Sequence, residues 1–285
     1  MQYHQCVIYA TRPDSRMSTI KAIHNAFNRF VLRRDFLTAE TNGLTFRVRT
    51  TDVVGRHIYK YGQHDPVMSD YLRRTLQPAD GDLLIDIGAN IGWYSVLFGH
   101  ASREVDAKVL CFEPDPTNYA LLANNIAVNR LAERIVAKSL ALADNADGAT
   151  LHLFGDSNLG RHSLLPIHGG DTVDIPTARL DDVIAATAEL ADRTPRLIKI
   201  DIEGFEYVAL QGAARTLSRC PRVVMEYSPH FMRKGDLEPA ALLDLMIDAG
   251  FEPGRLDDQQ RVGITRDQLL NDDRQIDLIW HRREA

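Results

Sequence analysis

Apolar residues in the middle of the chain come in short runs, and each run is followed by a turn and a stretch with helical spacing. The clearest run is at 83–87, where every residue except Asp86 is apolar, and it predicts a buried strand. Gly88 and Gly92 border the next turn, and residues 91–101 place apolar side chains on one side of a helix. Glycines let a backbone approach a ligand, and free N–H groups at a helix start point at it. This stretch therefore predicts a pocket of the nucleotide-binding type.

The same alternation of strand and helix continues toward the C-terminus. A second buried strand at 108–113 ends in an acid, Glu113. Further strands are expected at 135–142, 150–154, 172–176, 197–202, 222–227, from 251 onward and at 275–281. Helices are expected at 66–76, 116–129, 179–191, 204–217 and 236–249. Strands that alternate with helices predict an α/β fold around a mostly parallel sheet.

The first 60 residues follow a different pattern. Residues 18–34 have helical spacing, with an apolar face that includes Ile23 and Phe27. Residues 44–49 alternate apolar and charged positions, which predicts a half-exposed strand, and we expect its hairpin partner at 56–61. We interpret 1–60 as an extension of one helix and a β-hairpin that packs on a catalytic domain at 61–285.

The chemistry of the turn after the first strand favours a cationic ligand over a diphosphate. A dinucleotide fingerprint needs a second glycine that makes room for the pyrophosphate, and Asn90 stands at that place. Asp86 at the strand end would also repel a pyrophosphate. S-adenosylmethionine (SAM) carries both an amino group and a sulfonium, so it suits this turn better. An acid after the next strand, Glu113, can accept from both hydroxyls of a ribose, but this feature does not separate SAM from NAD.

Three segments together resemble a known family. They are DIGANIG at 86–92, FEP at 112–114 and IKIDIEGFE at 198–206, and they are similar to the signature segments of FkbM-type SAM-dependent methyltransferases. The resemblance covers roughly residues 61–253. It implies a class I SAM methyltransferase fold, Rossmann-like, with a seven-stranded sheet whose final strand is antiparallel. It also implies O-methyl transfer to a hydroxyl, often on a sugar or a natural product, without naming the acceptor.

The residues expected to hold the cofactor follow the strand ends and the turn. Ser95 is a candidate donor to the methionine carboxylate, and the strand end at Ala141 is expected near the adenine. The full set of expected cofactor-binding residues is Asp86, Gly88, Ala89, Asn90, Gly92, Ser95, Glu113, Pro114, Ala141 and Asp201.

Methyl transfer to a hydroxyl requires a base and an aligned acceptor. Asp201 and Glu203 are two residues apart on an extended segment, so they point the same way at the carboxyl edge of the sheet. We expect Asp201 to position the SAM amino group or the acceptor. For the base, the histidines His64 and His230 have the more suitable ordinary pKa. Glu226 ends the next strand, and His230 is expected in the loop that follows it. The candidate catalytic residues are Asp201, Glu203, Glu226, His230 and His64.

A metal and the identity of the acceptor are less well defined by the sequence. Asp201, Glu226 and a histidine could surround magnesium, but no fixed ligand spacing indicates a site, and none is expected. The long stretch at 155–170 is rich in glycine, histidine and serine, and it could meet a polyhydroxylated acceptor. Glycans, natural products with hydroxyls and carboxylates all remain compatible acceptors.

Composition gives no support to several other classes. The net charge of −6 gives no basic excess for nucleic acid or an anionic membrane, and no apolar run is long enough for a membrane span. Three widely spaced cysteines form no metal motif or disulfide framework, which favours the cytoplasm. Two alternatives from other classes are an NAD(P)-dependent oxidoreductase on a similar sheet and a SAM-binding protein without catalytic activity.

Overall fold

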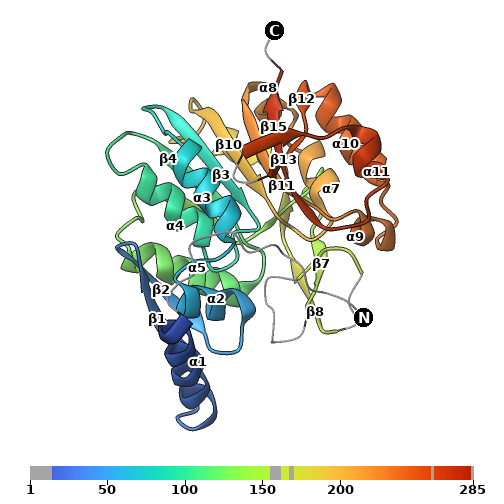
Figure 1. The fold of residues 1–285 in the computed structure, drawn as a ribbon. Coiled ribbons are helices and arrows are strands. Elements are labelled where there is room, and N and C mark those ends of the chain that lie inside the picture. The colour runs from blue at the N-terminus through green and yellow to red at the C-terminus, as the bar shows by residue number, and fades with distance from the viewer. Residues whose placement is uncertain (1–14, 155–161, 167–169, 258–259, 284–285) are drawn as a thin grey trace.

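The centre of the fold is a twisted sheet (Figure 1). A computed structural model of the chain describes residues 15–154, 162–166, 170–257 and 260–283. Within this part the main sheet has seven strands. In spatial order they are β12 (Phe251–Glu252), β15 (Ile276–Arg282), β11 (Arg222–Tyr227), β10 (Thr194–Ile200), β3 (Asp82–Ile87), β4 (Lys108–Phe112) and β5 (Ile135–Lys138). The ladders from β11 through β5 are parallel, whereas β15 runs antiparallel to both of its neighbours. The predicted α/β class with an antiparallel final strand is confirmed.

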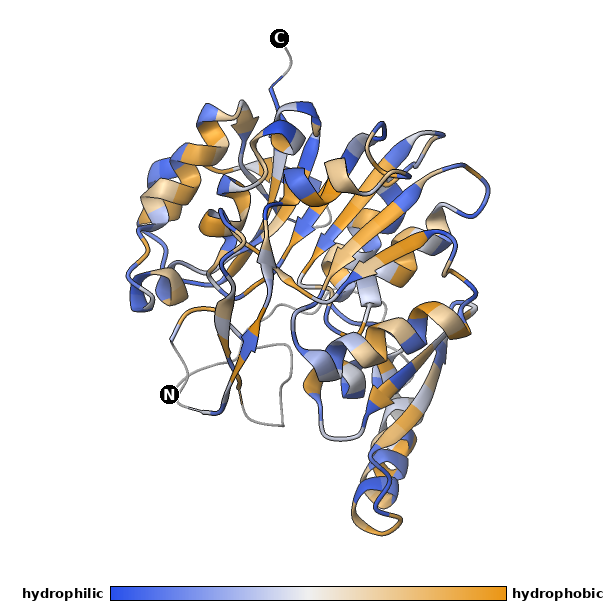
Figure 2. Ribbon diagram, turned by 180° about the vertical axis from the view of Figure 1, so that it is seen from behind, coloured by the Kyte–Doolittle hydropathy of each residue, from blue (hydrophilic) through white to orange (hydrophobic). Residues whose placement is uncertain are grey.

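The strands of this sheet are apolar on both faces because helices cover both sides. Along β3, Leu84 belongs to one hydrophobic core, whereas Leu83 and Ile85 belong to the other. In Figure 2 the central strands are accordingly mostly orange, in contrast to the mixed colours of the surface helices.

Within the described part of the chain, four helices contribute to the first core. They are α2 (Val53–Tyr61), α3 (Pro66–Thr75), α4 (Trp93–Ala101) and α5 (Pro116–Val128). The helices of the second core are α6 (Leu180–Ala186), α7 (Glu206–Gln211), α8 (Ala214–Arg219), α9 (Pro229–Lys234), α10 (Pro239–Asp248) and α11 (Arg266–Leu270). Ala89 and Ile91 of the glycine turn pack in the first core, and Ile200 and Tyr227, at the ends of β10 and β11, pack in the second.

The N-terminal hairpin differs from its prediction. Its strands are β1 (Phe36–Thr41) and β2 (Leu44–Arg49), joined by Asn42 and Gly43, both with positive φ. An Asn-Gly pair between alternating strands is a strong hairpin signal because both residues tolerate the left-handed turn. The expectation of a strand at 56–61 was wrong, since these residues belong to α2, which Asp52 caps by accepting from the Gly55 N–H at 2.7 Å.

Asn125 of α5 and Asn129, the residue that caps its C-terminus, attach this hairpin to the rest of the fold. Asn125 accepts from the Arg47 N–H at 2.7 Å and donates to the Ile91 carbonyl at 2.8 Å. Asn129 accepts from the Thr45 N–H at 2.9 Å and donates back to the Thr45 carbonyl at 2.6 Å. The free edge of β2 is therefore satisfied by side-chain amides, and the hairpin is joined to the turn that follows β3.

Several other boundaries differ from the prediction. The strand expected at 135–142 is split, because β6 (Ala141–Leu142) leaves the main sheet to pair with β9 (Thr177–Ala178). The helix expected at 204–217 is interrupted between α7 and α8, and the loop expected after Tyr227 is the helix α9.

The remaining elements lie outside the main sheet. They are α1 (Ser15–Phe30), β7 (Ala149–His152), β8 (Thr172–Ile175), β13 (Gly254–Asp257) and β14 (Gln260–Gly263). The strands β7 and β8 confirm the expected strands at 150–154 and 172–176, and most of the loop between them, 155–161 and 167–169, lies outside the described residues. Among the helices described, none combines the length and the apolar character needed to cross a membrane.

Candidate functional site

The turn between β3 and α4 brings the backbone very close to the end of β10. Gly88 has a φ of +78°, and a Cβ at this position would lie 2.0 Å from the Asp201 carbonyl oxygen. Asn90 also lies in the left-handed region, with a φ of +51°, and its side chain accepts from the Ile91 N–H at 2.7 Å. Only a glycine fits the position of Gly88, so the local sequence dictates this tight turn.

Glu113 joins the turn to the end of β4. Its two carboxylate oxygens accept from the backbone N–H groups of Asn90 at 2.7 Å and of Asp115 at 3.0 Å. Burial raises the pKa of Glu113 to about 8, although these hydrogen bonds partly offset the effect of burial. The carboxylate is thus held in one orientation at the mouth of the turn.

A cleft whose empty volume is about 860 Å³, including space open to solvent, lies along the carboxyl ends of β3, β4 and β10. Open parallel sheets bind ligands at this edge. Of the expected cofactor residues, those that line the cleft are Gly88, Ala89, Asn90, Glu113, Pro114, Ala141 and Asp201. The apolar residues beside them include Leu140, Leu142, Ile202 and Phe205. The cleft therefore combines an apolar slot with a few fixed polar groups, as small-molecule sites do.

Three of the expected cofactor residues lie beneath the cleft. The Asp86 side chain is fully buried, and its Oδ2 accepts from the Ser95 hydroxyl at 2.6 Å. Gly92 begins α4 with a φ of +90° and packs against Leu122. Asp86, Ser95 and Gly92 are not among the lining residues, so they support the floor of the cleft from below.

Lys199 links the buried Asp86 to the cleft. Its ammonium lies 3.2 Å from Asp201 Oδ2 and 4.0 Å from Asp86 Oδ1. Burial alone would lower the pKa of Lys199, but the two carboxylates outweigh it and the pKa is raised. A permanently charged lysine therefore orients the Asp201 carboxylate at the cleft surface.

His64 also lines the cleft, on the corner that starts α3. Its carbonyl accepts from the Ser69 hydroxyl at 2.8 Å, which fixes the corner. The Nδ1 atom of His64 is buried and has no hydrogen-bond partner within the described residues. Burial lowers the pKa of His64, against the opposing influence of Asp65 and Asp201. The neutral imidazole is therefore favoured at neutral pH, which is the form that can accept a proton.

Asp65 and Tyr94 extend this corner. Asp65 has a φ of +42°, a strained conformation for a residue other than glycine, and it caps α3 through the Met68 N–H. The Tyr94 hydroxyl donates to Asp65 Oδ2 at 2.5 Å, and the Lys199 ammonium lies 5.0 Å from the centre of its ring. Burial and the Asp65 carboxylate raise the pKa of Tyr94 well above its ordinary value, so the hydroxyl remains a donor.

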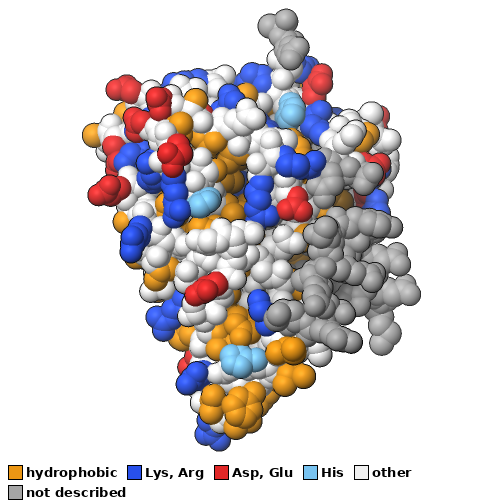
Figure 3. Space-filling model, turned by 60° about the vertical axis from the view of Figure 1, so that its left-hand side comes forward, with side chains coloured by type: hydrophobic (Ala, Val, Ile, Leu, Met, Phe, Trp, Pro, Cys, Tyr) orange, Lys and Arg blue, Asp and Glu red, His pale blue; other side chains and the backbone are white. Residues whose placement is uncertain are grey.

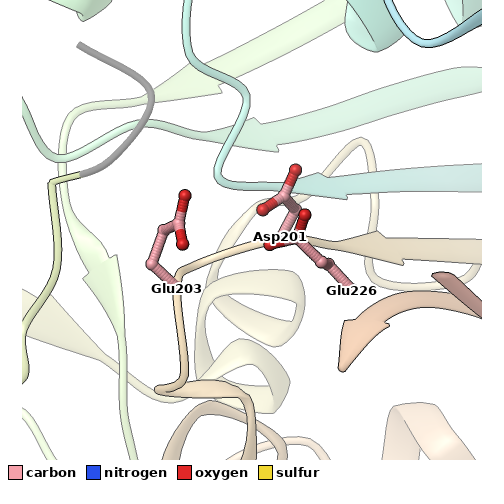
Figure 4. A group of neighbouring side chains, drawn as sticks. All are labelled: Asp201, Glu203 and Glu226. Atoms are coloured by element: carbon pink, nitrogen blue, oxygen red, sulfur yellow. The ribbon is translucent and has the colours of Figure 1, made fainter. Parts of the chain in front are cut away.

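Asp201, Glu203 and Glu226 meet where β10 and β11 end (Figure 4). One carboxylate oxygen from each lies within 4.8 Å of the others. Burial and the neighbouring acids Asp201 and Glu203 raise the pKa of Glu226 well above its ordinary value. The Gln275 amide donates to Glu226 and lies 3.4 Å from Glu203 Oε2. By donor chemistry this group could hold an oxygen-ligated divalent cation.

His230 lies away from this arrangement. It is exposed on α9, where its ring packs against Phe231, and it does not line the cleft. The prediction placed His230 in a loop at the strand end, but Pro229 starts a helix there that points the side chain to the surface. The geometry therefore does not support His230 as a base.

Some lining residues were not assigned to the site from the sequence. Tyr94 falls within the predicted helix at 91–101 and Lys199 within the predicted strand at 197–202, and neither pattern by itself indicates a site. Burying a lysine in a strand costs free energy unless the charge is paired. Its position two residues before Asp201 could therefore have indicated that Lys199 pairs with this carboxylate. Asn118 and Phe205 also line the cleft, and no pattern in the sequence singles them out.

Comparison with known proteins agrees with this geometry. A family model described as the methyltransferase FkbM domain matches residues 86–253. The chain belongs to the FkbM methyltransferase family. This confirms the resemblance that the three segments indicate.

The FkbM relatives differ in how much of their length the chain covers. The chain is 31% identical over 168 residues to the 31-O-demethyl-FK506 methyltransferase FkbM of Streptomyces tacrolimicus, covering 50% of this chain and 63% of that protein. It is 28% identical over 179 residues to the 2-O-methyltransferase NoeI of Sinorhizobium fredii, and the match covers 58% of this chain and 70% of that protein. The crystal structure of an FkbM methyltransferase from Methylobacillus flagellatus matches with 21% identity and a TM-score of 0.45. The match covers 74% of this chain and 46% of that one. The match thus spans less than two thirds of the FkbM relative from Streptomyces.

Proposed function

We propose that this chain transfers the methyl group of SAM to a hydroxyl oxygen of a sugar or natural product. Membership of the FkbM methyltransferase family supports methyl transfer. The names of two relatives, one for 31-O-demethyl-FK506 and one a 2-O-methyltransferase, support oxygen as the acceptor atom. Residues 61–285 would form the catalytic domain, and residues 1–60 its extension.

The observation that carries the proposal is the position of Glu113 beside the Gly88 turn. Each Glu113 oxygen accepts one backbone hydrogen bond, and the Asn118 side chain gives a further one. An ionised carboxylate has about four acceptor sites, so in this form Glu113 can also accept from a ribose hydroxyl. The Asn90 side chain occupies the place where a dinucleotide-binding turn has a glycine to make room for the pyrophosphate. Its backbone N–H already donates to Glu113. The cleft therefore suits an adenosine without a diphosphate.

The chemistry requires alignment and one proton acceptor. Bound SAM would supply an electrophilic methyl group on a positively charged sulfur. Asp201, oriented by Lys199, would position the acceptor hydroxyl, and the imidazole of His64, which lines the cleft, would take its proton as the oxygen attacks. General-base assistance of this kind contributes about two to four orders of magnitude in rate. The rigid corner at Asp65 would keep the imidazole in place.

We propose that transfer proceeds without a metal ion. Each of the three clustered carboxylates already has an ionic or hydrogen-bonding partner. Lys199 pairs with Asp201, the Gln275 amide contacts Glu203 and Glu226, and the raised pKa of Glu226 favours its neutral form. A bound cation would have to displace these partners.

The test is a transfer assay with a labelled methyl donor against host glycan and metabolite fractions. We expect an alkali-stable methyl ether as product, whereas an alkali-labile ester would show that the acceptor is a carboxylate. His64→Gln should lower kcat about 100-fold or more while S-adenosylhomocysteine affinity, measured by calorimetry, stays within about twofold. His230→Gln is the matched control and should behave as wild type.

Two outcomes would contradict the proposal. Tight binding of NAD with no binding of S-adenosylhomocysteine would favour an oxidoreductase on a similar sheet. Full activity of His64→Gln would remove the histidine from the mechanism and leave Asp201 as the next base to test.

A further inference from the structure

The helix α1 presents its apolar side chains to solvent. The described residues include nine large apolar side chains that are exposed, and six of them lie between positions 20 and 32. Those on the helix or just after it are Ile20, Ile23, Phe27, Phe30, Val31 and Leu32. Ile23 and Phe30 are 65% and 70% exposed. Figure 3 shows this patch as a concentration of apolar atoms at the tip of the molecule where α1 lies.

The side of α1 that packs on the protein is polar. His24 Nδ1 lies 2.5 Å from the Tyr59 hydroxyl, and Asn25 donates to the Thr50 carbonyl. Asn28, which is 1% exposed, bonds to His24 and Arg34. A surface helix normally buries its apolar face and exposes its polar one. In α1 this relation is reversed, so its apolar face needs a partner from outside the described chain.

The spacing of the apolar residues makes them one continuous face. With 3.6 residues per turn, positions 20, 23, 27, 30 and 31 fall within an arc of about 100°. The sequence 15–34 contains five basic residues and no acidic residue, although the whole chain carries a net charge of −6. Arg33 and Arg34 follow the helix directly, and both are exposed. The segment is thus an apolar face accompanied by positive charge alone.

We propose that α1 is a membrane-surface helix that binds anionic lipid. Its apolar face would enter the boundary between headgroups and acyl chains, and its basic residues would meet the negative surface. Charge decides between this partner and a second copy of the chain. Two copies of α1 would bring five positive charges against five, without an acid in either segment to compensate. An anionic bilayer provides the opposite charge and an apolar interior together.

The experiment is sedimentation of the full-length protein with lipid vesicles. The vesicles would be phosphatidylcholine alone, or phosphatidylcholine with about one third phosphatidylglycerol, a fraction that makes the surface clearly negative. We expect wild type to pellet with the anionic vesicles only, and less at high salt because the charge is screened. Ile23→Ser with Phe30→Ser should lower partitioning about tenfold or more, since two apolar anchors are removed. Arg33→Gln should lower it about fivefold.

Two controls separate lipid binding from misfolding. Val262→Ser removes an apolar side chain that is 44% exposed on β14 and should leave partitioning unchanged. The circular dichroism and thermal unfolding of all variants should match wild type. Wild type that fails to pellet with anionic vesicles would overturn the proposal. A concentration-dependent dimer in solution, lost in the Ile23→Ser and Phe30→Ser variant, would also overturn it and identify a second copy as the partner.

Discussion

At the scale of single residues, the site depends on charged groups whose other bonds fix their direction. The Glu113 carboxylate is bound to the backbone N–H groups of Asn90 and Asp115, and the Asp201 carboxylate is bound to Lys199. Side chains held in this way lose little further freedom when a ligand arrives, so more of the interaction free energy is available for binding. Substituting Glu113 or Asp201 would therefore also break these bonds within the protein.

A substitution at Glu113 tests the ribose contact. Glu113→Gln leaves a single acceptor oxygen and removes the ionisable carboxyl, so one acceptor for the ribose and for the backbone N–H groups is lost. We expect S-adenosylhomocysteine affinity, measured by calorimetry, to fall about 10- to 100-fold. Asp144→Asn, a comparable change in an exposed turn, should leave affinity unchanged. Unchanged binding in Glu113→Gln would place the ribose elsewhere in the cleft.

At the scale of elements, the hairpin β1–β2 and helix α5 are coupled to the glycine turn by Asn125. This side chain is 0% exposed and bridges the Arg47 backbone of β2 to the Ile91 carbonyl. An isolated two-stranded hairpin is marginally stable, so its order depends on such attachment and on the core it shares with α2. The extension and the cofactor turn are therefore expected to lose structure together.

Replacing Asn125 tests this coupling. Asn125→Leu keeps the approximate volume but leaves the Arg47 N–H and the Ile91 carbonyl without partners in a buried place. We expect the free energy of unfolding, from urea titration, to fall by about 3 kcal/mol. Asn145→Leu makes the same chemical change at an exposed position and should cost less than about 0.5 kcal/mol. Equal effects of the two variants would show that Asn125 does not join the elements.

At the scale of the whole molecule, buried carboxylates make stability depend on pH. Burial raises the pKa of Glu113 to about 8 and that of Glu206 to about 7, and Glu206 Oε2 has no hydrogen-bond partner among the described residues. A carboxyl whose folded pKa lies above its unfolded value stabilises the fold fully below the unfolded pKa. That stability is lost as pH rises through the folded pKa. The protein should therefore be more stable near pH 5 to 6 than near pH 8.

The Glu206→Gln variant isolates one part of this dependence. Glu206 Oε1 accepts from the Ile202 and Gly204 N–H groups, and a glutamine oxygen can keep both bonds. Between about pH 5 and pH 8, wild type should lose about 2 kcal/mol more stability than the variant. Urea unfolding at each pH measures the difference, with Glu133→Gln on the surface as control. A variant that loses stability in parallel with wild type would assign the pH dependence to other groups.

The sequence by itself determined the features that depend on local pattern. The strand at 83–87, the tight turn at Gly88 and the acid Glu113 follow from short-range rules. An apolar run must be buried, and only glycine tolerates the left-handed backbone beside Asp201. The alternation of strands and helices similarly sufficed for the α/β class and the sheet. The Asn-Gly pair at 42–43 was an equally local signal for the hairpin, although the strand was expected elsewhere.

Only the tertiary structure decided which side chains face the cleft. Asp86 lies under the turn, bound to Ser95, because α4 packs directly against β3. Lys199 stands between Asp86 and Asp201 because β10 is the neighbour of β3 in the sheet. The orientation of a polar side chain depends on which distant residues pack beside it. Periodicity along the chain contains no information about those partners, so the arrangement of the site appears only once the elements are assembled.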